Sequence, residues 1–476
     1  MGVKLTVIGA GPGGYAAAVR AAQLGAEVTL IEKEKAGGTC LHWGCIPSKI
    51  MKTAAEIIRK ASRGVEFGLR PSEPPEPDMP GLMRRKERIL EDQAKGLLHL
   101  FKKNGIRYLQ GHAAVEAAGR IVVSTADAPP VEVEWERLIL AVGSRPAPLP
   151  GAPFNGRTIL SSDHALSLQH VPGSMLIVGG GVIGCEFASI FSSLGSTVTT
   201  VEAMDRLLPV AGVDEDCSKT LQREMKKRKI GVHLNAGVQE VSESDSGCRV
   251  TIGPSPFEQG APQGRKTTRV DADCVLVCIG RRPNTEGLGL EKLGLKPGDR
   301  GWLSADLRME TGVPGVYAIG DILGPDRVML AHVASTEGRI AAENALGGSL
   351  EMSYDAVPGA IFTSPEVGVV GRTEAEARAA GYDVLAETTL FRTLGKAHVI
   401  GEIGGQAKIV FEKTTGRILG VHLIGPGASD LISEATLAVR TGCTVEDVAR
   451  TIHAHPTLSE IMLETALKAA GRPFHA

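Results

Sequence analysis

Two stretches of the chain share one pattern of apolar and polar positions. Residues 3–32 read VKLTVIGAGPGGYAAAVRAAQLGAEVTLIE, and residues 173–202 read GSMLIVGGGVIGCEFASIFSSLGSTVTTVE. Each begins with an apolar run, continues through G-x-G-x-x-G into a segment with small residues on one helical face, and ends in a second apolar run closed by Glu. The repeat predicts two copies of one strand–helix–strand unit.

The glycine motif has the chemistry of a dinucleotide site. Gly9 and Glu32 are 23 positions apart, as are Gly179 and Glu202. The first glycine allows a tight turn, the second lets a pyrophosphate approach the backbone, and the third lets helix and strand pack closely. The helix N-terminus then faces the phosphates, and the Glu accepts hydrogen bonds from a ribose hydroxyl. The sequence therefore predicts two dinucleotide sites.

Between and after the repeats, the sequence predicts a loop, a helix and several short strands. PSEPPEPDMPG, residues 71–81, contains five prolines and is typical of an irregular surface loop, and residues 81–104 have the pattern of a charged amphipathic helix. LILAVGSRP at 138–146 ends a series of short β-type segments, and VLVCIGRRP at 275–283 resembles it. VYAIGD at 316–321 closes another strand.

The sequence pattern changes at about residue 351. Glycine turns and alternating strands, such as 408–411 and 418–424, precede two predicted helices. This pattern predicts a separate α+β domain.

Composition excludes several classes of protein. The 476 residues are 43% apolar and 22% charged, with a net charge of −2, so nucleic acid is not an expected partner. No uncharged apolar run reaches the roughly 18 residues of a membrane span, so no membrane is expected either. Eight cysteines are too few for a disulfide scaffold. The apolar N-terminus lacks the basic run of a signal peptide, and we expect a reducing cytoplasm.

Two cysteines stand close together in GGTCLHWGCIPSK, residues 37–49. Cys40 and Cys45 fit a buried structural pair, but they lack the third cysteine of an iron–sulfur site. With His42 they still fall short of four zinc ligands, so no metal is expected. A redox-active pair is favoured, because two thiols beside a flavin or nicotinamide relay two electrons. Lys49 and a local helix start favour the thiolate.

Seven motifs stand in order along nearly the whole chain. They are G-x-G-x-x-G with Glu32, GGTC-x₄-C-IPSK, A-V-G-S-R-P, the second G-x-G-x-x-G with Glu202, I-G-R-R-P-N, A-I-G-D, and HAHPTLSE at 453–460. Together they resemble the flavoprotein pyridine nucleotide–disulfide oxidoreductases. The PSK and HPTLSE segments look most like the branch of that family that oxidises dihydrolipoamide and passes the electrons to NAD.

The resemblance implies an α/β fold with two Rossmann-like dinucleotide-binding domains and a C-terminal α+β dimerisation domain. The expected ranges are 1–150 for the FAD domain with its redox disulfide, 151–280 for the NAD domain, 281–350 for a central segment returning to the FAD domain, and 351–476 for the interface.

The resemblance also implies site residues for each cofactor. Lys49 is similar to the family's lysine near the flavin ring, paired with Glu186 on the second nucleotide helix. The expected FAD contacts are Gly9, Gly11, Gly14, Glu32, Lys49, Ala113, Gly143, Ser144, Asp321, Ala331 and His332. The expected NAD contacts are Gly179, Gly181, Gly184, Glu202, Val238 and Gly280.

Glu202 also bears on the choice between NAD and NADP. A carboxylate at that strand end suits a free 2′-hydroxyl and repels a 2′-phosphate. Arg206, four residues on, is either a solvated loop residue or an NADP contact, and NAD is favoured.

By resemblance, His455 is the catalytic base and Glu460 orients it, while His453 is structural. A histidine of ordinary pKa takes a thiol proton near neutral pH, and a carboxylate fixes its tautomer. The substrate thiolate would attack Cys40, and Cys45 would pass the electron pair to FAD. The pair is expected to reach the cysteines of the other subunit of a homodimer.

The resemblance leaves the lipoyl-bearing partner and the substrate open. No lipoyl domain precedes Val3, so the lipoyl group is expected on a partner protein of a 2-oxoacid dehydrogenase or glycine cleavage complex. The main alternative is an NAD(P)H-dependent reductase of another disulfide or of a metal ion. The chain ends GRPFHA without the redox group that mercuric or large thioredoxin reductases carry there, and Glu202 disfavours a glutathione-type enzyme. A docking role on a larger complex is compatible with catalysis.

One feature departs from the family pattern. Small or amide-bearing residues usually separate the cysteines, whereas this chain has Leu41, His42, Trp43 and Gly44. The other six cysteines lack a partner pattern and are expected to be structural.

Overall fold

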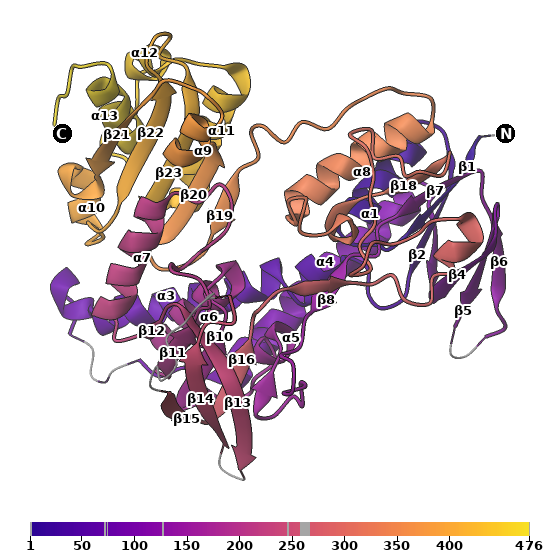
Figure 1. Ribbon diagram of the computed structural model, residues 1–476, viewed down its shortest axis with the longest axis horizontal. Helices are drawn as coiled ribbons and strands as arrows, with labels where there is room; N and C mark the ends of the chain where they lie inside the picture. The colour runs from indigo at the N-terminus through magenta and orange to yellow at the C-terminus, as the bar shows by residue number, and fades with distance from the viewer. Residues whose placement is uncertain are drawn as a thin grey trace.

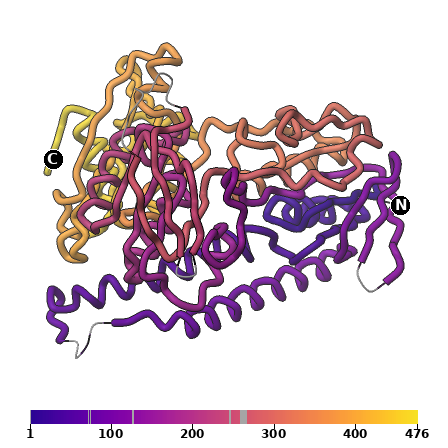
Figure 2. The backbone as a smooth tube through the Cα atoms, turned by 60° about the horizontal axis from the view of Figure 1, so that its bottom comes forward, coloured from indigo at the N-terminus to yellow at the C-terminus, as the bar shows by residue number. Residues whose placement is uncertain are grey.

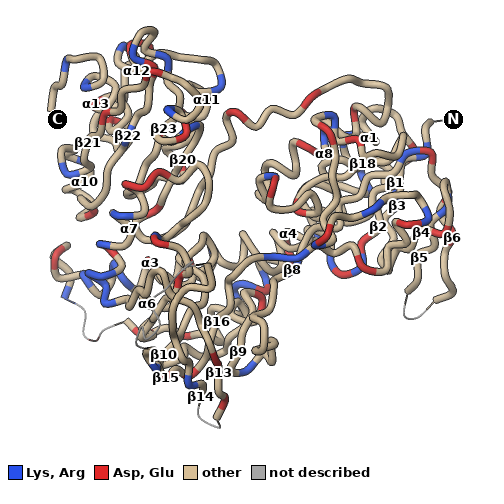
Figure 3. The backbone as a smooth tube through the Cα atoms, in the orientation of Figure 1, with Lys and Arg blue, Asp and Glu red and all other residues tan. Residues whose placement is uncertain are grey.

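The computed structural model describes residues 2–70, 73, 75–125, 128–244, 247–257 and 267–475. Three parts are separated in space: one sheet near the N-terminus, a second below the centre of the view, and the C-terminal part at the upper left (Figure 1). Lys, Arg, Asp and Glu are distributed over all three parts (Figure 3).

The first repeat forms a parallel five-stranded sheet. Its order is β18 (Val316–Ala318), β7 (Arg137–Leu140), β1 (Lys4–Ile8), β2 (Glu27–Glu32) and β3 (Arg107–Gln110). Helices α1 (Pro12–Gln23) and α8 (Ala331–Ala345) pack closely on each other, since a Cβ at Gly338 would lie 2.3 Å from the Gly13 carbonyl oxygen. A small antiparallel sheet follows, formed by β4 (His112–Ala117), β5 (Arg120–Ser124) and β6 (Val131–Glu134).

The second repeat has the same architecture. Its parallel sheet has the order β12 (Gly231–His233), β11 (Thr197–Val201), β10 (Ser174–Val178), β16 (Cys274–Val277) and β9 (Ile159–Leu160), with helices α5 (Ser162–Ala165), α6 (Val182–Leu194) and α7 (Glu215–Lys227). Its antiparallel sheet consists of β13 (Ala236–Ser244), β14 (Gly247–Pro254) and β15 (Thr268–Ala272). The two units match strand for strand around their glycine turns.

A two-stranded ribbon joins these units. β8 (Ser144–Pro146) pairs antiparallel with β17 (Arg281–Pro283), so the two similar Gly-x-Arg-Pro elements of the sequence lie side by side. The chain therefore enters and leaves the second unit through this ribbon.

Three further helices lie between β2 and the first small sheet. They are α2 (Gly38–His42), α3 (Cys45–Ser62) and the long α4 (Met79–Lys103), which runs along one side of the molecule (Figure 2). Among the described residues, 3₁₀ turns are formed by Gly64–Phe67, Leu290–Leu293, Gly320–Leu323 and Phe391–Thr393.

The predicted loop and helix boundary near residue 81 was wrong by two residues. Helix α4 begins at Met79 because Asp78 caps it, accepting a 2.9 Å hydrogen bond from the Gly81 N–H. Pro80 is tolerated because the first helical turn needs no donor there. Pro71, Ser72 and Pro74 of the predicted loop lie outside the described residues.

The C-terminal part is a five-stranded antiparallel sheet with helices. The order is β19 (Gly359–Ile361), β20 (Glu366–Gly371), β23 (Ile418–Gly425), β22 (Gln406–Glu412) and β21 (Val384–Leu390), with α9 (Glu374–Ala379) and α10 (Gly395–Val399) in the connections. Three helices, not the predicted two, follow the last strand: α11 (Ala428–Thr441), α12 (Val445–Arg450) and α13 (Glu460–Ala469). The glycine at 442 ends the first, so the chain turns before Thr444 caps the next.

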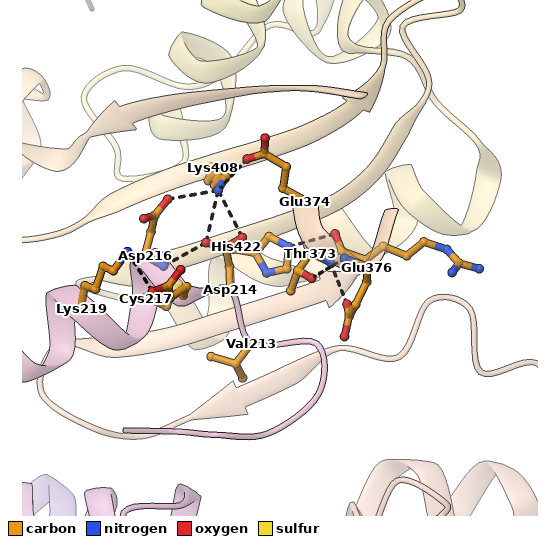
Figure 4. A network of polar contacts seen from close by, with 12 residues as sticks. Val213, Asp214, Asp216, Cys217, Lys219, Thr373, Glu374, Glu376, Lys408 and His422 are labelled. Atoms are coloured by element: carbon orange, nitrogen blue, oxygen red, sulfur yellow. Dashed lines mark hydrogen bonds and ion pairs between the residues drawn. The ribbon is translucent and has the colours of Figure 1, made fainter. Parts of the chain in front are cut away.

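A buried lysine connects this part to the second unit (Figure 4). The Nζ atom of Lys408 on β22 lies 3.2 Å from Asp214 Oδ2, 3.1 Å from Asp216 Oδ2 and 3.1 Å from Glu374 Oε2. Asp214 also caps α7. Burial opposes ionisation of Asp214, but the Asp216 N–H and the neighbouring cations outweigh it and hold the pKa of Asp214 below its usual value.

We predict that Lys408→Met lowers the melting temperature by several degrees at pH 7, because removing one partner of a buried charge cluster costs about 3 kcal/mol. Because the pKa of Asp214 is lowered in the folded protein, its ionised carboxylate stabilises the fold fully above about pH 4. This stabilisation is lost as the pH falls through the folded-state pKa of Asp214. The pKa of Lys408 is raised, so its ammonium stays charged throughout this range.

The difference between variant and wild type should thus narrow below about pH 4 in thermal melts followed by circular dichroism. Lys413→Met is the control, since Lys413 follows the same strand and is exposed. Equal loss in both variants would contradict the role of the cluster.

Candidate active site

The cysteine segment packs directly on the first glycine turn. The Gly37 N–H donates to the Ala10 carbonyl at 2.9 Å, and a Cβ on Gly38 would lie 2.7 Å from the Gly11 Cα. Both glycines have positive φ, which a side chain would strain. The glycines of GGTC therefore bring α2, with Cys40, against the turn where a pyrophosphate is expected.

Cys40 and Cys45 are free thiols within hydrogen-bonding reach of each other. Cys45 is the first residue of α3, and the positive end of a helix dipole favours a thiolate. The hydrogen bond from Cys40 lowers the pKa of Cys45 to about 7; burial and Glu186 oppose this, while Lys49 favours it. The same hydrogen bond and burial raise the pKa of Cys40. The two thiols are therefore chemically unequal, with Cys45 the more readily ionised.

Lys49 and Glu186 form an ion pair beside these thiols. The Lys49 Nζ donates to Glu186 Oε2 at 2.9 Å and lies 4.1 Å from the centre of the Phe362 ring. Glu186 is buried and also accepts a 2.9 Å hydrogen bond from the Phe362 N–H. The sequence predicted the pair but not Phe362, whose residue type carries no signal of such a role.

The glycines of the two turns occupy equivalent positions. Gly9 has φ 103° and Gly179 has φ 108°. A Cβ on Gly14 would lie 1.8 Å from the Gly9 carbonyl oxygen, and one on Gly184 would lie 1.9 Å from that of Gly179. These positions accept only glycine for reasons internal to the fold.

The middle glycines differ from the others. A Cβ on Gly11 or Gly181 would meet no atom of the chain within 4 Å, and both residues have ordinary negative φ. Each caps its nucleotide helix without a side-chain hydrogen bond. The open space in front of a free helix N-terminus fits a pyrophosphate at both turns.

The two strand-end glutamates also make matching contacts. Glu32 accepts from the Ala10 N–H at 2.7 Å and the Glu34 N–H at 2.8 Å. Glu202 accepts from the Gly180 N–H at 2.5 Å and the Met204 N–H at 2.8 Å. Both carboxylates are buried, which raises the pKa of Glu32.

The Arg206 side chain is hydrogen-bonded within the chain, so it is not favoured as a nucleotide contact. Its Nη1 donates to the Val213 carbonyl at 3.0 Å and to the Ser218 hydroxyl at 2.9 Å. The guanidinium is therefore held by the loop before α7 and by α7 itself.

Ala113 and Val238 lie at equivalent positions of the repeat. The Gly111 N–H donates to the Glu32 carbonyl at 2.8 Å, and the Ala236 N–H donates to the Glu202 carbonyl at 3.0 Å. Ala113 and Val238 each follow two residues later, on β4 and β13, with side chains packed on their cores. Ala113 is buried, so its backbone is what it offers a cofactor, whereas Val238 is half-buried.

The ribbon holds a polar group between the units. The Ser144 hydroxyl donates to Asp321 Oδ2 at 2.6 Å and accepts from Arg281 Nε at 2.6 Å. Gly143 and Gly280 flank it with positive φ. Sequence reasoning missed Arg281, although its place in G-R-R-P marked the position.

Ala331 and His332 begin α8 beside the first glycine turn. The Ser335 hydroxyl of the same helix donates to the Pro12 carbonyl at 3.2 Å. The ring Nε2 of His332, which is exposed, lies 2.9 Å from the Pro358 carbonyl oxygen.

His455 and Glu460 stand together, but apart from the cysteines. His455 Nδ1 lies 2.8 Å from Glu460 Oε1, and its side chain is 76% exposed. Burial opposes ionisation of Glu460, yet hydrogen bonds from His455 and Thr457 hold its pKa below the usual value. The side chain of His453, by contrast, is buried, and its Nε2 lies 3.0 Å from Glu434 Oε1. The hydrogen bond with Glu434 raises the pKa of His453, although burial opposes this. The His455 loop joins α12 to α13, away from α3 (Figures 1 and 2).

Between the cysteines, His42 and Trp43 interact locally. The His42 Nε2 lies 2.8 Å from the Ala36 carbonyl oxygen, and its ring centre lies 5.3 Å from that of Trp43. The residues that the structure describes contain no metal-binding group of three or more His, Cys, Asp or Glu side chains. No helix formed by them is long and apolar enough to span a membrane.

The chain is similar to curated proteins over its full length. It is 40% identical to a dihydrolipoyl dehydrogenase of Halobacterium salinarum, covering 100% of this chain and 98% of the relative. It is 39% identical to the human mitochondrial dihydrolipoyl dehydrogenase, covering 98% of this chain and 90% of the relative.

Solved structures share its fold. LpdA from Mycobacterium tuberculosis superposes with a TM-score of 0.89 at 29% identity, covering 98% of this chain and 99% of that one. The HOCl-induced flavoprotein disulfide reductase RclA from Escherichia coli superposes with a TM-score of 0.83 at 26% identity, covering 97% of this chain and 99% of that one. Its Cu(II) complex gives a TM-score of 0.84 at 25% identity, covering 98% of this chain and 99% of that one.

Two family models divide the chain between them. Pyridine nucleotide-disulphide oxidoreductase matches residues 3–338, and the dimerisation domain of the same family matches residues 357–466. These matches confirm the predicted fold class, the FAD and NAD cofactors that the family implies, and the homodimer. The chain belongs to the pyridine nucleotide-disulphide oxidoreductase family.

Proposed function

We propose that the chain oxidises protein-bound dihydrolipoamide to lipoamide and passes the electron pair to NAD. The full-length similarity to dihydrolipoyl dehydrogenases supports the substrate. The observation that carries the chemistry is the unequal thiol pair formed by Cys40 on α2 and Cys45 at the start of α3, beside the Lys49 ammonium.

The first glycine turn binds FAD and the second binds NAD. Residues 1–150 and 281–350 serve FAD, residues 151–280 serve NAD, and residues 351–476 form the dimer interface. The open space at Gly11 and Gly181 supports pyrophosphate binding at both turns. Gly9, Gly11, Gly14 and Glu32 would hold FAD, which would supply the two-electron chemistry that links the cysteines to NAD.

The substrate reduces the Cys40–Cys45 disulfide in two thiol–disulfide exchange steps. With Cys40 and Cys45 as a disulfide, one substrate thiolate attacks the Cys40 sulfur, forming a mixed disulfide and releasing the Cys45 thiolate. The second substrate thiolate attacks the substrate sulfur of that bond, which closes the lipoamide disulfide and releases Cys40. The electron pair is then held by the cysteines, and the low pKa of Cys45 keeps it as a thiolate near neutral pH.

His455 takes the proton of the attacking substrate thiol, and the proton of the second thiol ends on the released Cys40 sulfur, whose pKa is raised by its hydrogen bond with Cys45 and by burial. Glu460 holds the ring through Nδ1, which leaves Nε2 free to accept a proton. The exposure of His455 and its distance from α3 support action on the cysteines of the other subunit. The active site is thus shared across the homodimer.

NAD rather than NADP is the nucleotide. The buried carboxylate of Glu202 suits a 2′-hydroxyl and repels a phosphate, while Arg206 is held elsewhere. The lipoyl group arrives on a partner protein of a 2-oxoacid dehydrogenase or glycine cleavage complex. Eight cysteines in 476 residues are too few for a disulfide scaffold, which supports a reducing cytoplasm as the location.

The purified protein should reduce NAD anaerobically with dihydrolipoamide as donor, and do so poorly with glutathione or with NADP. NADH absorbance measures turnover. Cys45→Ser should retain FAD yet lose dithiol-dependent turnover, because no disulfide forms. Normal turnover in this variant, or faster reaction with glutathione, would overturn the proposal in favour of another disulfide substrate.

His455→Gln should slow reduction of the flavin by dihydrolipoamide about 10²- to 10⁴-fold, the usual contribution of a general base. Reduction of the flavin by NADH should change much less, since that half-reaction needs no proton from a thiol. Stopped-flow flavin absorbance separates the two, with His453→Gln as the neighbouring control. Equal loss in both halves would remove His455 from the role of base.

Gly181→Ala should raise the KM for NAD about tenfold or more, because its Cβ enters the space proposed for the pyrophosphate. Its negative φ accepts alanine, so FAD content and melting temperature should stay close to wild type. Gly184→Ala, whose Cβ meets the Gly179 carbonyl, should instead lower the melting temperature. An unchanged KM in a folded Gly181→Ala protein would place the nucleotide elsewhere.

A further inference from the structure

A turn of the C-terminal part reaches the ion pair beside the cysteines. Residues 362–365 connect β19 to β20, and this turn lies between α3 and α6. The Ser364 N–H donates to the Ser189 hydroxyl on α6 at 3.3 Å. Glu366, at the end of the turn, pairs with Lys52 on α3 and accepts from the Ser429 hydroxyl at 2.7 Å. The turn is therefore attached to both helices.

Phe362 makes two distinct contacts from this turn. Its backbone N–H donates to Glu186 Oε1. The centre of its ring lies 4.1 Å from the Lys49 Nζ atom and 5.5 Å from the Lys52 Nζ atom. A cation over an aromatic face is attracted to it, more strongly where water is excluded. One residue thus touches both members of the ion pair.

We propose that Phe362 is a positioning residue that holds the Lys49 ammonium and the Glu186 carboxylate so that the ammonium stabilises the Cys45 thiolate. Lys49 lies one turn after Cys45 on α3 and favours its ionisation, whereas Glu186 opposes it. Without the ring, Lys49 keeps only its ion pair with Glu186, and its ammonium is no longer held in place beside the sulfur. The inference rests on the proposed role of Cys45 as the thiol that faces the flavin.

The charged and titratable groups around Cys45 come from four helices. They are Tyr15 on α1, Cys40 on α2, Lys49 on α3 and Glu186 on α6. Phe362 adds no charge, so its effect on the thiol passes through Lys49 and Glu186 alone.

The test is the pH profile of Cys45 alkylation by iodoacetamide in the reduced, FAD-loaded holoenzyme. Peptide mass spectrometry follows Cys45 separately from the other cysteines. Phe362→Leu should move the midpoint to higher pH and slow alkylation at pH 6 about threefold or more, as the loss of a cation–π contact predicts. Phe362→Tyr keeps an aromatic face and should restore the wild-type profile. If Phe362→Leu loses FAD, Phe362→Met takes its place.

Two comparisons separate positioning from a general packing effect. In a Lys49→Met background, Phe362→Leu should cause no further shift, because the ammonium through which it acts is gone. Phe187→Leu removes a ring from α6 that stacks on Phe191, and should leave the midpoint unchanged.

An unchanged midpoint in Phe362→Leu, or an equal shift with and without Lys49, would overturn the inference. Alkylation needs no lipoyl substrate, so these results stand apart from the turnover assay. Turnover with another disulfide would change the proposed function and leave the alkylation result intact.

Discussion

The ion pair between Lys49 and Glu186 is the contact on which the arrangement of the active site depends. Lys49 belongs to the helix that begins at Cys45, Glu186 belongs to the nucleotide helix of the second unit, and Phe362 comes from the C-terminal part. A buried carboxylate needs a partner, because desolvation without one is costly. The pair therefore fixes three parts of the chain at one point beside the thiols.

Much of the fold was predictable because glycine has few substitutes. Gly9 and Gly14 are required by a positive φ and by a carbonyl that leaves no room for a Cβ, and such constraints leave a fixed spacing in the sequence. The spacing repeats around Gly179 and Gly184, and the two units have the same strand order. Ala113 and Val238 fit this repeat through their backbones, with no signal in their side chains.

What the sequence did not reveal depends on contacts between distant segments. Phe362 is an ordinary apolar residue, and only the placement of its turn between α3 and α6 gives it two polar neighbours. In the sequence, Lys408 is a single charged residue in a strand of alternating pattern, and nothing predicts its partners. In the structure, three carboxylates from two parts of the chain surround it. The start of α4 was misplaced because the prolines before it suggested a loop, whereas Asp78 provides a cap and the first turn accepts Pro80.

The ribbon of β8 and β17 has a consequence for how such a chain arises. Pro146 pairs with Arg281, so residues 147–280 leave and return at neighbouring positions. The sheet of the first unit takes β7 from before this excursion and β18 from after it, and none of its strands lies within it. An insertion of residues 147–280 at this ribbon would therefore add a second nucleotide-binding unit without interrupting any strand of the first sheet.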